Sequence, residues 1–344
     1  MPSTTPAAAA RRPRAAVAMK PDAAAAVLAP RSLAALAEVC ALAPLPVLDD
    51  FTTDRARATL ADAELLVTGW GCPPLDETVL AAAPRLRAVV HTAGSVRGHI
   101  TEACWDRGIE VSSAAAANAL PVAEYTVAMI LLSGKRALER ARDYRVERRR
   151  DDWLRTSPEV GNYGRTVGIL SASLIGRRVI ELLRPYDLRV LLHDPYVSAA
   201  DAADLGVRPV ELAELFAQSD VVSVHTPLLP ATRGLVSREL LTSMRPDGVL
   251  INTSRGAVVD QHALTDVLQL GRIRAILDVT DPDALPSAHP LWECDNALIT
   301  PHLAGSQGNE WQRLVDLAVR EIGRWAAGDG FAHPVRRERL AFLA

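Results

Sequence analysis

The chain has 344 residues, 49% of them hydrophobic, and a formal net charge of −3 at pH 7. This length and apolar content predict two domains with sizeable cores. The weak negative charge argues against nucleic acid or an anionic membrane surface as a partner. The longest apolar run, residues 125–134, is shorter than the roughly 20 residues of a membrane-spanning helix, so we interpret it as a buried helix.

The N-terminal segment and the cysteines bear on the cellular location. Residues 1–14 carry Arg and Ala but no following apolar segment, which predicts a disordered tail and not a signal peptide. The four cysteines show no CxxC or zinc-finger spacing: Cys40, Cys72, Cys104 and Cys294. We therefore expect a reducing, cytoplasmic location and no metal site.

Strands and helices alternate through the first third of the chain. Apolar runs predict strands at residues 14–20, 63–71, 87–95 and 109–113, and helical spacing predicts helices at 29–44 and 76–86. A long helical stretch follows at residues 118–153, apolar in its first half and charged in its second. Its run Arg148–Arg150 lies among many acidic residues, which is more typical of a solvated helix face than of a nucleic-acid patch.

The alternation restarts after residue 164. It predicts strands at 166–170, 188–195, 220–227, 248–254, 274–280 and 296–305, and helices at 174–186, 211–218, 237–244 and 261–271. The strand interiors are continuously apolar, which is typical of a parallel sheet covered on both faces. The sequence thus predicts two α/β halves that meet around residues 115–122. A final helix at 310–328 follows the last strand and can return to the first half.

A turn of small residues in the second half is the cofactor candidate. Dinucleotide-binding loops have Gly-x-Gly-x-x-Gly there, whereas this chain has Ser171-x-Ser173-x-x-Gly176. Asp194, 23 positions after Ser171, stands where an acidic side chain binds ribose hydroxyls and disfavours NADP. The helix that begins near Leu174 offers free backbone N–H groups to a pyrophosphate, whatever the side chains are.

The two serines leave this interpretation open. If either position requires a positive φ, a serine there costs on the order of 1–2 kcal/mol of conformational free energy. A serine hydroxyl can also donate a hydrogen bond to a phosphate oxygen and so offset part of this cost. Taken by itself, the turn fits a plain strand–turn–helix with no ligand as well as it fits a cofactor site.

Three further segments follow later strands, at the edge where open α/β sheets bind ligands. Arg255 has the bidentate guanidinium that suits a substrate carboxylate, although a surface salt bridge would also explain it. The next segment carries Asp278, Asp281 and Asp283, and it also fits a plain acidic turn. His302 follows the last strand, where a histidine is more often structural than catalytic.

Together, five segments resemble the D-2-hydroxyacid dehydrogenase family: "HTAGS", "NALPVAEYT", "NTSRG", "LDVTDPDALP" and "TPHLAGS". They follow the family's order and spacing from about residue 60 to 325. The resemblance implies a Rossmann-type parallel-sheet NAD-binding domain, residues 119–304, inserted into a smaller flavodoxin-like α/β substrate domain. The substrate domain would combine residues 15–118 with residues 305–344.

The resemblance also implies how the two domains move and associate. Hinges would fall near residues 118–122 and 303–308, and domain closure would exclude water from the reaction. The helix from Pro121 onward would form part of a homodimer surface.

The same resemblance implies an Arg–acid–His site. His302 would protonate the keto oxygen during reduction and act as the base in the reverse direction. Asp283 stands where the family has Glu, so its stem is one methylene shorter. We therefore expect either a longer hydrogen bond to His302 or a shifted loop. Arg255 would bind the substrate carboxylate and polarise the carbonyl.

The remaining site residues are also implied by the resemblance. For NAD they are Ser171, Ser173, Leu174, Ile175 and Gly176 at the pyrophosphate, Asp194 at the ribose, Thr226 and Pro227 at the adenosine half, and Thr253 and Asp278 at the nicotinamide. Backbone N–H groups of Ala93, Gly94, Ser95 and Val96 would hold the substrate carboxylate.

We therefore expect an NAD-dependent oxidoreductase that reduces a small 2-oxo acid to a D-2-hydroxy acid, or catalyses the reverse reaction. Two alternatives stay open. One is a non-catalytic dinucleotide-binding regulator or scaffold, motivated by the two serines and the shortened acid, although the intact Arg255 and His302 argue against it. The other is a specialised-pathway enzyme with changed chemistry, because function depends on the site and not on the fold.

Overall fold

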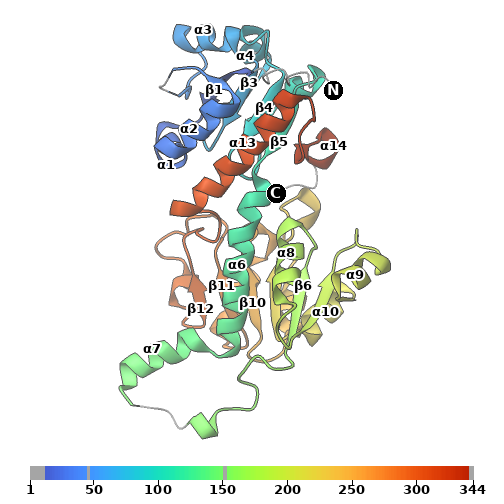
Figure 1. The fold of residues 1–344 in the computed structure, drawn as a ribbon. Helices are drawn as coiled ribbons and strands as arrows, with labels where there is room; N and C mark the ends of the chain where they lie inside the picture. The colour runs from blue at the N-terminus through green and yellow to red at the C-terminus, as the bar shows by residue number, and fades with distance from the viewer. Residues whose placement is uncertain (1–11, 45–46, 150–152, 341–344) are drawn as a thin grey trace, which may run out of the picture. The chain divides into compact units, whose positions relative to one another are not determined.

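The computed structural model describes residues 12–44, 47–149 and 153–340 (Figure 1). Contacts between Cα atoms divide the chain into two compact units. Unit 1 contains the described residues up to Asn118 and those from Ser306 onward, and unit 2 extends from Ala119 to Gly305. Most of the predicted tail lies outside the described residues, and the first strand already begins at Arg14. The α/β class predicted from the sequence is confirmed in both units.

Unit 1 is built on a six-stranded sheet with the order β13-β5-β4-β3-β1-β2. Its strands are β1 (Arg14–Ala18), β2 (Ala41–Leu42), β3 (Leu65–Thr68), β4 (Ala88–His91), β5 (Glu110–Ser113) and β13 (Pro334–Val335). Only the β13–β5 pair is antiparallel among the described ladders of this sheet. The carboxyl ends of β3 and β4 therefore lie side by side.

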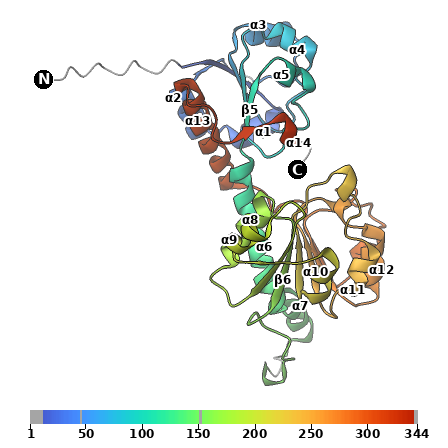
Figure 2. The same ribbon diagram turned by 90° about the vertical axis from the view of Figure 1, so that its right-hand side faces the viewer.

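Helices cover both faces of this sheet (Figure 2). They are α1 (Pro21–Val27), α2 (Pro30–Val39), α3 (Asp54–Asp62), α4 (Glu77–Ala82), α5 (Glu102–Asp106), α13 (Trp311–Ala327) and α14 (Arg337–Leu340). Leu65 and Val67 of β3 pack against α2 and α13, whereas Leu66 packs against α3 and α4 on the other face. Burial on both faces explains why the strand is apolar at every position.

Unit 2 contains a seven-stranded parallel sheet with the order β12-β11-β10-β9-β6-β7-β8. The strands are β6 (Thr166–Leu170), β7 (Arg189–His193), β8 (Arg208–Pro209), β9 (Val221–Val224), β10 (Val249–Asn252), β11 (Arg274–Leu277) and β12 (Ala297–Ile299). The chain order reverses between β6 and β9. Open α/β sheets bind ligands outside the carboxyl ends of the strands at such a switch point.

The helices of unit 2 also form two layers, one on each face of the sheet (Figure 2). They are α6 (Ala115–Gly134), α8 (Leu174–Leu183), α9 (Ala199–Leu205), α10 (Leu212–Gln218), α11 (Arg238–Ser243) and α12 (Gln261–Gln269). Helix α7 (Ala137–Glu147) has no buried residue and belongs to neither core cluster. Residues of α6, α8 and α9 share a core cluster with β6, and residues of α10 and α12 form a second cluster with β9 and β10.

Helix α6 is the one described helix whose length and mean hydropathy, 1.5, would allow it to cross a membrane. Its Ala123, Val127 and Ile130 pack into the core of unit 2 with Val167 and Ile169 of β6. We therefore interpret α6 as a core helix.

The predicted helical stretch 118–153 is not one helix, and this prediction was wrong. Helix α6 ends at Gly134, and Arg136 has a φ of 50°, in the left-handed region, before α7 begins. The side chain of Asn162 donates to the carbonyl of Leu131 at 3.0 Å and occupies the space that a Cβ at Gly134 would need. The chain therefore turns here because another segment caps the end of α6.

Candidate active site

The predicted site residues of unit 2 lie in loops that follow β6, β7, β9, β10, β11 and β12, or at the start of α8. These strands are parallel, so the loops share the carboxyl edge of one sheet. Arg255, Asp283 and His302 follow β10, β11 and β12, which are successive neighbours. The fold therefore brings the three catalytic candidates to one edge, beside the loop after β6.

Ser171 carries the strain that its substitution for glycine predicts. Its φ is 78°, in the left-handed region that glycine adopts without cost. Its hydroxyl is hydrogen-bonded to Thr226 Oγ1 at 2.8 Å. Thr226 is itself buried, so this bond stabilises the turn and offsets part of the strain.

Ser173 has no such cost. It is the N-cap of α8, with a φ of −61°, and its hydroxyl accepts a hydrogen bond from the Gly176 N–H at 3.3 Å. Gly176 is required by close packing, because a Cβ there would overlap the carbonyl oxygen of Ser171. The free N–H groups at the start of α8, and the close approach that Gly176 permits, fit the pyrophosphate of a dinucleotide.

Asp194 follows β7 and is hydrogen-bonded to the same turn. One carboxylate oxygen accepts from the N–H of Ala172 at 2.8 Å, and the other accepts from the N–H of Tyr196 at 2.8 Å. The side chain is half-buried and retains lone pairs that can accept ribose hydroxyls. Its place beside the phosphate turn fits its predicted role at the ribose.

His225 supports the turn from below and was not singled out in the sequence. It directly follows β9, its Nε2 lies 2.9 Å from Ser223 Oγ, and its Cβ lies 3.5 Å from where a Cβ on Gly176 would be. Complete burial lowers its pKa to about 3. The ring is therefore neutral at pH 7 and places no charge under the phosphate turn.

The strain at Ser171 gives a test on stability. Ser171→Ala keeps the energetic cost of the left-handed conformation and loses the hydrogen bond to Thr226. Ser171→Gly loses the same hydrogen bond but also removes the cost of the conformation. We expect the Gly variant to exceed the Ala variant by about 1 kcal/mol in free energy of unfolding, measured by urea denaturation. Equal stabilities would mean that the turn relaxes to a negative φ. An equal loss of NADH affinity in both variants would show that the Ser171 hydroxyl contributes to cofactor binding.

The turn that carries Arg255 is shaped by Asn252, the last residue of β10, which the sequence analysis did not identify. Its Oδ1 accepts from the N–H of Ser254 at 3.0 Å and from the Ser254 hydroxyl at 2.9 Å, and its Nδ2 donates to the carbonyl of Arg255 at 3.0 Å. Asn252 is 1% exposed, so it can satisfy these groups without competition from water. The half-buried Arg255 donates from Nη1 to the Ser254 carbonyl at 2.7 Å.

Gly256 lets the Arg255 turn lie against the acidic loop after β11. A Cβ on Gly256 would overlap the carbonyl group of Thr280 and would lie 2.6 Å from the backbone nitrogen of Asp281. No flexible side chain is involved, so the two backbones could not both stay in place. Gly256 therefore sets how closely the Arg255 turn and the loop with Asp283 approach.

Two side chains hold the acidic loop in this position. Gln261 accepts from the N–H of Asp281 at 2.8 Å and donates to the carbonyl of Asp281 at 2.7 Å. The hydroxyl of Thr280 lies 2.7 Å from the carbonyl oxygen of Pro282 and 3.1 Å from that of Asp283. Asp283 therefore lies on an exposed loop whose backbone is held by the side chains of Gln261 and Thr280.

Asp283 and His302 form a pair. Nδ1 of His302 lies 3.2 Å from one carboxylate oxygen of Asp283 and 3.3 Å from the other. These distances are long for a hydrogen bond to a charged group. His302 has a φ of 53°, and its side chain is 49% exposed. With Nδ1 directed at the carboxylate, Nε2 is the ring nitrogen that can face a substrate.

Asp278 holds the turn that carries His302. Its side chain is 2% exposed. One carboxylate oxygen accepts from the Thr300 hydroxyl at 2.7 Å and the Leu303 N–H at 2.8 Å, and the other accepts from the Ala304 N–H at 2.9 Å. The His302 N–H donates to the carbonyl of Asp278 at 3.0 Å. The predicted nicotinamide contact of Asp278 stays a prediction, and the structure adds this supporting role.

The other predicted cofactor residues line the same edge. Thr253 is buried, with Oγ1 3.2 Å from Thr126 Oγ1 in α6. Pro227 is the third residue after the end of β9, and it is half-buried. Leu174 and Ile175 form the first turn of α8, where Leu174 is 53% exposed.

The predicted carboxylate-binding residues belong to unit 1. Ala93, Gly94, Ser95 and Val96 follow β4 at the carboxyl edge of that unit's sheet. Ala93 and Val96 are buried, whereas Ser95 is exposed. The hydroxyl of Thr68, at the end of the neighbouring strand β3, contacts residues at both ends of this loop.

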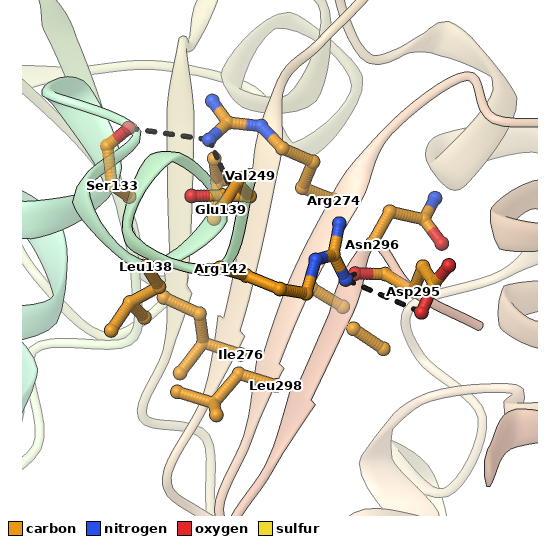
Figure 3. A pocket seen from close by; sticks show the side chains of 12 residues that line it. Ser133, Leu138, Glu139, Arg142, Val249, Arg274, Ile276, Asp295, Asn296 and Leu298 are labelled. Atoms are coloured by element: carbon orange, nitrogen blue, oxygen red, sulfur yellow. Dashed lines mark hydrogen bonds and ion pairs between the residues drawn. The ribbon is translucent and has the colours of Figure 1, made fainter. Parts of the chain in front are cut away.

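A separate cavity of about 170 Å³ lies at the opposite edge of the unit 2 sheet, beside α7 and the start of β11 (Figure 3). Arg274 crosses it to Glu139 at 2.9 Å, and Arg142 reaches Asp295 at 3.3 Å. The charged groups labelled there are paired with one another, and the predicted catalytic residues do not line the cavity. The chemistry predicted above therefore belongs to the carboxyl edge.

The strand order, the phosphate turn and Asp194 together define unit 2 as a Rossmann-type dinucleotide-binding domain. The family model described as "D-isomer specific 2-hydroxyacid dehydrogenase, NAD binding domain" matches residues 128–304. The chain therefore belongs to the D-isomer-specific 2-hydroxyacid dehydrogenase family, and its cofactor is NAD.

Similar proteins cover the chain to different extents. A "D-3-phosphoglycerate dehydrogenase" of Mycobacterium tuberculosis is 32% identical over 306 residues, which is 88% of this chain but 56% of that protein. This chain therefore spans little more than half of that relative. A "Glyoxylate reductase" of Thermofilum pendens is 33% identical over 256 residues, 72% of this chain and 74% of that protein.

A solved "phosphoglycerate oxidoreductase" from Rhizobium etli has the same fold, with a TM-score of 0.81 at 22% identity. The match covers 95% of this chain and 99% of that one.

Proposed function

We propose that the protein catalyses NAD-dependent reduction of a small 2-oxo acid to a D-2-hydroxy acid, or the reverse reaction. The observation that carries this proposal is the His302–Asp283 pair in the loops after β12 and β11, with Arg255 in the turn after the adjacent strand β10. A proton donor, a carboxylate that orients it and a cation for an anionic substrate are the groups that reduction of a 2-oxo acid requires. Domain assignments follow: unit 2 binds NAD and unit 1 contributes substrate contacts.

When bound, NAD would supply the hydride in reduction and take it up in oxidation. Asp283 accepts a hydrogen bond from the Nδ1–H of His302, and this bond keeps Nε2 directed at the substrate oxygen. In reduction, Nε2–H donates its proton to the keto oxygen, and in oxidation the free Nε2 accepts the hydroxyl proton. Arg255 binds the carboxylate and polarises the carbonyl, and backbone N–H groups of residues 93–96 also bind the carboxylate.

Asp278 and Asn252 act through the backbone. Asp278 fixes the turn of His302, and Asn252 fixes the turn of Arg255. Neither needs to contact the substrate for its loss to lower activity. We expect these two residues to behave as positioning residues.

The proposal includes a cytoplasmic homodimer. The four cysteines are buried and unpaired, as in a reducing compartment. Side chains on α6 and α7 that would favour association are exposed, and they include Leu132, Leu138, Tyr144 and Val146. Sedimentation velocity at micromolar concentration measures the oligomeric state.

The test is turnover of reduced cofactor. The protein is mixed with NADH and glyoxylate, hydroxypyruvate, pyruvate or phenylpyruvate, and the loss of NADH absorbance is followed. Turnover of at least one acid, with methyl pyruvate turned over far less well than pyruvate, supports the proposal and the role of Arg255. Binding of NADH without turnover of any 2-oxo acid would favour a regulator, and turnover of another class of carbonyl would favour changed chemistry.

The choice of NAD over NADP depends on the charge of Asp194. Asp194→Asn removes the charge and keeps one oxygen acceptor for the turn. We expect the ratio of kcat/KM with NADH to that with NADPH to fall by on the order of tenfold, the equivalent of about 1.4 kcal/mol. Asp194→Ala should lower the ratio as well and also destabilise the turn. An unchanged ratio in both variants would mean that Asp194 does not face the ribose.

A further inference from the structure

Thr68, the last residue of β3, makes four hydrogen bonds to the end of β4 and the segment that follows it. Its carbonyl oxygen accepts from the Thr92 N–H at 2.8 Å and from the Thr92 hydroxyl at 2.9 Å. Its hydroxyl oxygen lies 2.9 Å from Nδ1 of His91 and 3.1 Å from Nε2 of His99. One residue therefore holds this segment at its first residues and at its end.

These groups are enclosed in the core of unit 1. Thr68 and Thr92 are 0% exposed, His91 is 3% exposed and His99 is 4% exposed. The two imidazole rings are 4.6 Å apart. Water therefore cannot replace any of these bonds if one partner is removed, and the group left behind would be buried without a partner.

Both histidines are neutral. Burial lowers the pKa of His91 to about 3, helped by the nearby His99, and burial lowers the pKa of His99 to about 4. A neutral imidazole has one N–H donor and one acceptor nitrogen. The Thr68 hydroxyl can therefore donate to one ring and accept from the other, so that a single side chain bonds one nitrogen of each ring.

The segment held in this way contains the residues assigned to the substrate. His91 and His99 flank residues 92–98, which include Ala93–Val96. The carbonyl of His99 also accepts from the Leu75 N–H at 2.8 Å, so the same connection reaches the loop that follows β3. Backbone N–H groups can bind a carboxylate only if the loop that carries them has a fixed conformation.

We propose that Thr68 is a positioning residue for substrate binding. Its hydroxyl fixes both ends of the loop 92–98 and thereby directs the backbone N–H groups of Ala93–Val96 toward the carboxylate of a 2-oxo acid. This inference rests on the function proposed above. A purely structural polar network would affect stability but would leave the affinity for the acid unchanged in the folded protein.

The test uses Thr68→Val, which removes the hydroxyl and keeps the branched shape, and Thr68→Ser, which keeps the hydroxyl. We expect Thr68→Val to raise KM for the 2-oxo acid about tenfold with kcat changed by less than about threefold, because a carboxylate contact acts on ground and transition states alike. Thr68→Ser should stay within about threefold of wild type in KM. The Kd for NADH should be unchanged in both.

Thr265→Val is the matched control. Thr265 is buried in α12 of unit 2, and its hydroxyl is bonded to the Gln261 carbonyl of its own helix at 2.7 Å. This variant should leave KM unchanged. If Thr68→Val does not fold, His99→Leu and His99→Gln replace it, since only Gln keeps a polar nitrogen in the place of Nε2. A folded Thr68→Val or His99→Leu with wild-type KM overturns the inference.

Binding of oxamate to the NADH complex separates this inference from the proposed function. If wild type binds oxamate but turns over no 2-oxo acid, the proposed function fails, and the Kd of oxamate replaces KM in the comparison of Thr68→Val with Thr68→Ser. A tenfold weaker Kd in Thr68→Val alone supports the inference. If wild type does not bind oxamate and turns over no 2-oxo acid, both are overturned.

Discussion

His302→Ala is expected to lower kcat for reduction of the 2-oxo acid by about 10²- to 10⁴-fold, because it removes the proton donor. The Kd for NADH should stay within about twofold of wild type, since the phosphate turn at Ser171–Gly176 follows β6 and does not involve His302. Steady-state kinetics and a fluorescence titration of NADH measure the two quantities. His262→Ala is the control, because His262 is an exposed histidine of α12. Loss of less than tenfold in His302→Ala would exclude His302 as the acid.

Asp283 variants show what the long contact to His302 contributes. Asp283→Asn removes the charge that orients Nδ1–H, and we expect kcat to fall by about 10- to 100-fold. Asp283→Glu adds one methylene to the side chain, which can shorten the contact of 3.2 Å. A kcat above that of wild type in Asp283→Glu would show that the shorter side chain of Asp283 limits the activity of this protein.

The fold was largely predictable because its strands are buried on both faces. A continuous apolar run bounded by turn residues marked each of β6, β9, β10 and β11. The short helices α1, α3, α5 and α9 were not predicted from the sequence. Helices as short as α1 and α3, which have seven and nine residues, carry too weak a periodic signal. The break between α6 and α7 was missed as well, because the cap comes from Asn162, distant in sequence.

The candidate site was predictable only where a residue type carries its chemistry. Asp194, Arg255 and His302 could be identified from the sequence because their side chains are charged or act as acids and bases, and because each follows a strand. Asn252 and Thr68 do not, because they act through bonds to backbone or to rings that the fold brings near. The strain at Ser171 was an open question, since the sequence does not determine the sign of φ for a serine in a turn.

Gly256→Ala is expected to reduce kcat/KM by about 10²-fold although no catalytic side chain is changed. The added Cβ would overlap the carbonyl group of Thr280 and crowd the nitrogen of Asp281, and both atoms belong to backbone. The acidic loop must then move, and Asp283 moves with it, away from His302. The crowding should also lower the free energy of unfolding by about 1–3 kcal/mol.

Gly323→Ala is the control for a glycine that space does not require. Gly323 lies in α13, and the nearest atom to an added Cβ would be Val39 Cγ1 at 3.7 Å. Since alanine favours a helix over glycine by up to about 1 kcal/mol, this variant should be as stable as wild type or more so, with unchanged kinetics. Gly256→Ala should keep its NADH affinity, because the phosphate turn lies between the end of β6 and the first turn of α8. Wild-type kcat/KM in a folded Gly256→Ala variant would mean that the approach of the Arg255 turn to the acidic loop does not set the geometry of the His302–Asp283 pair.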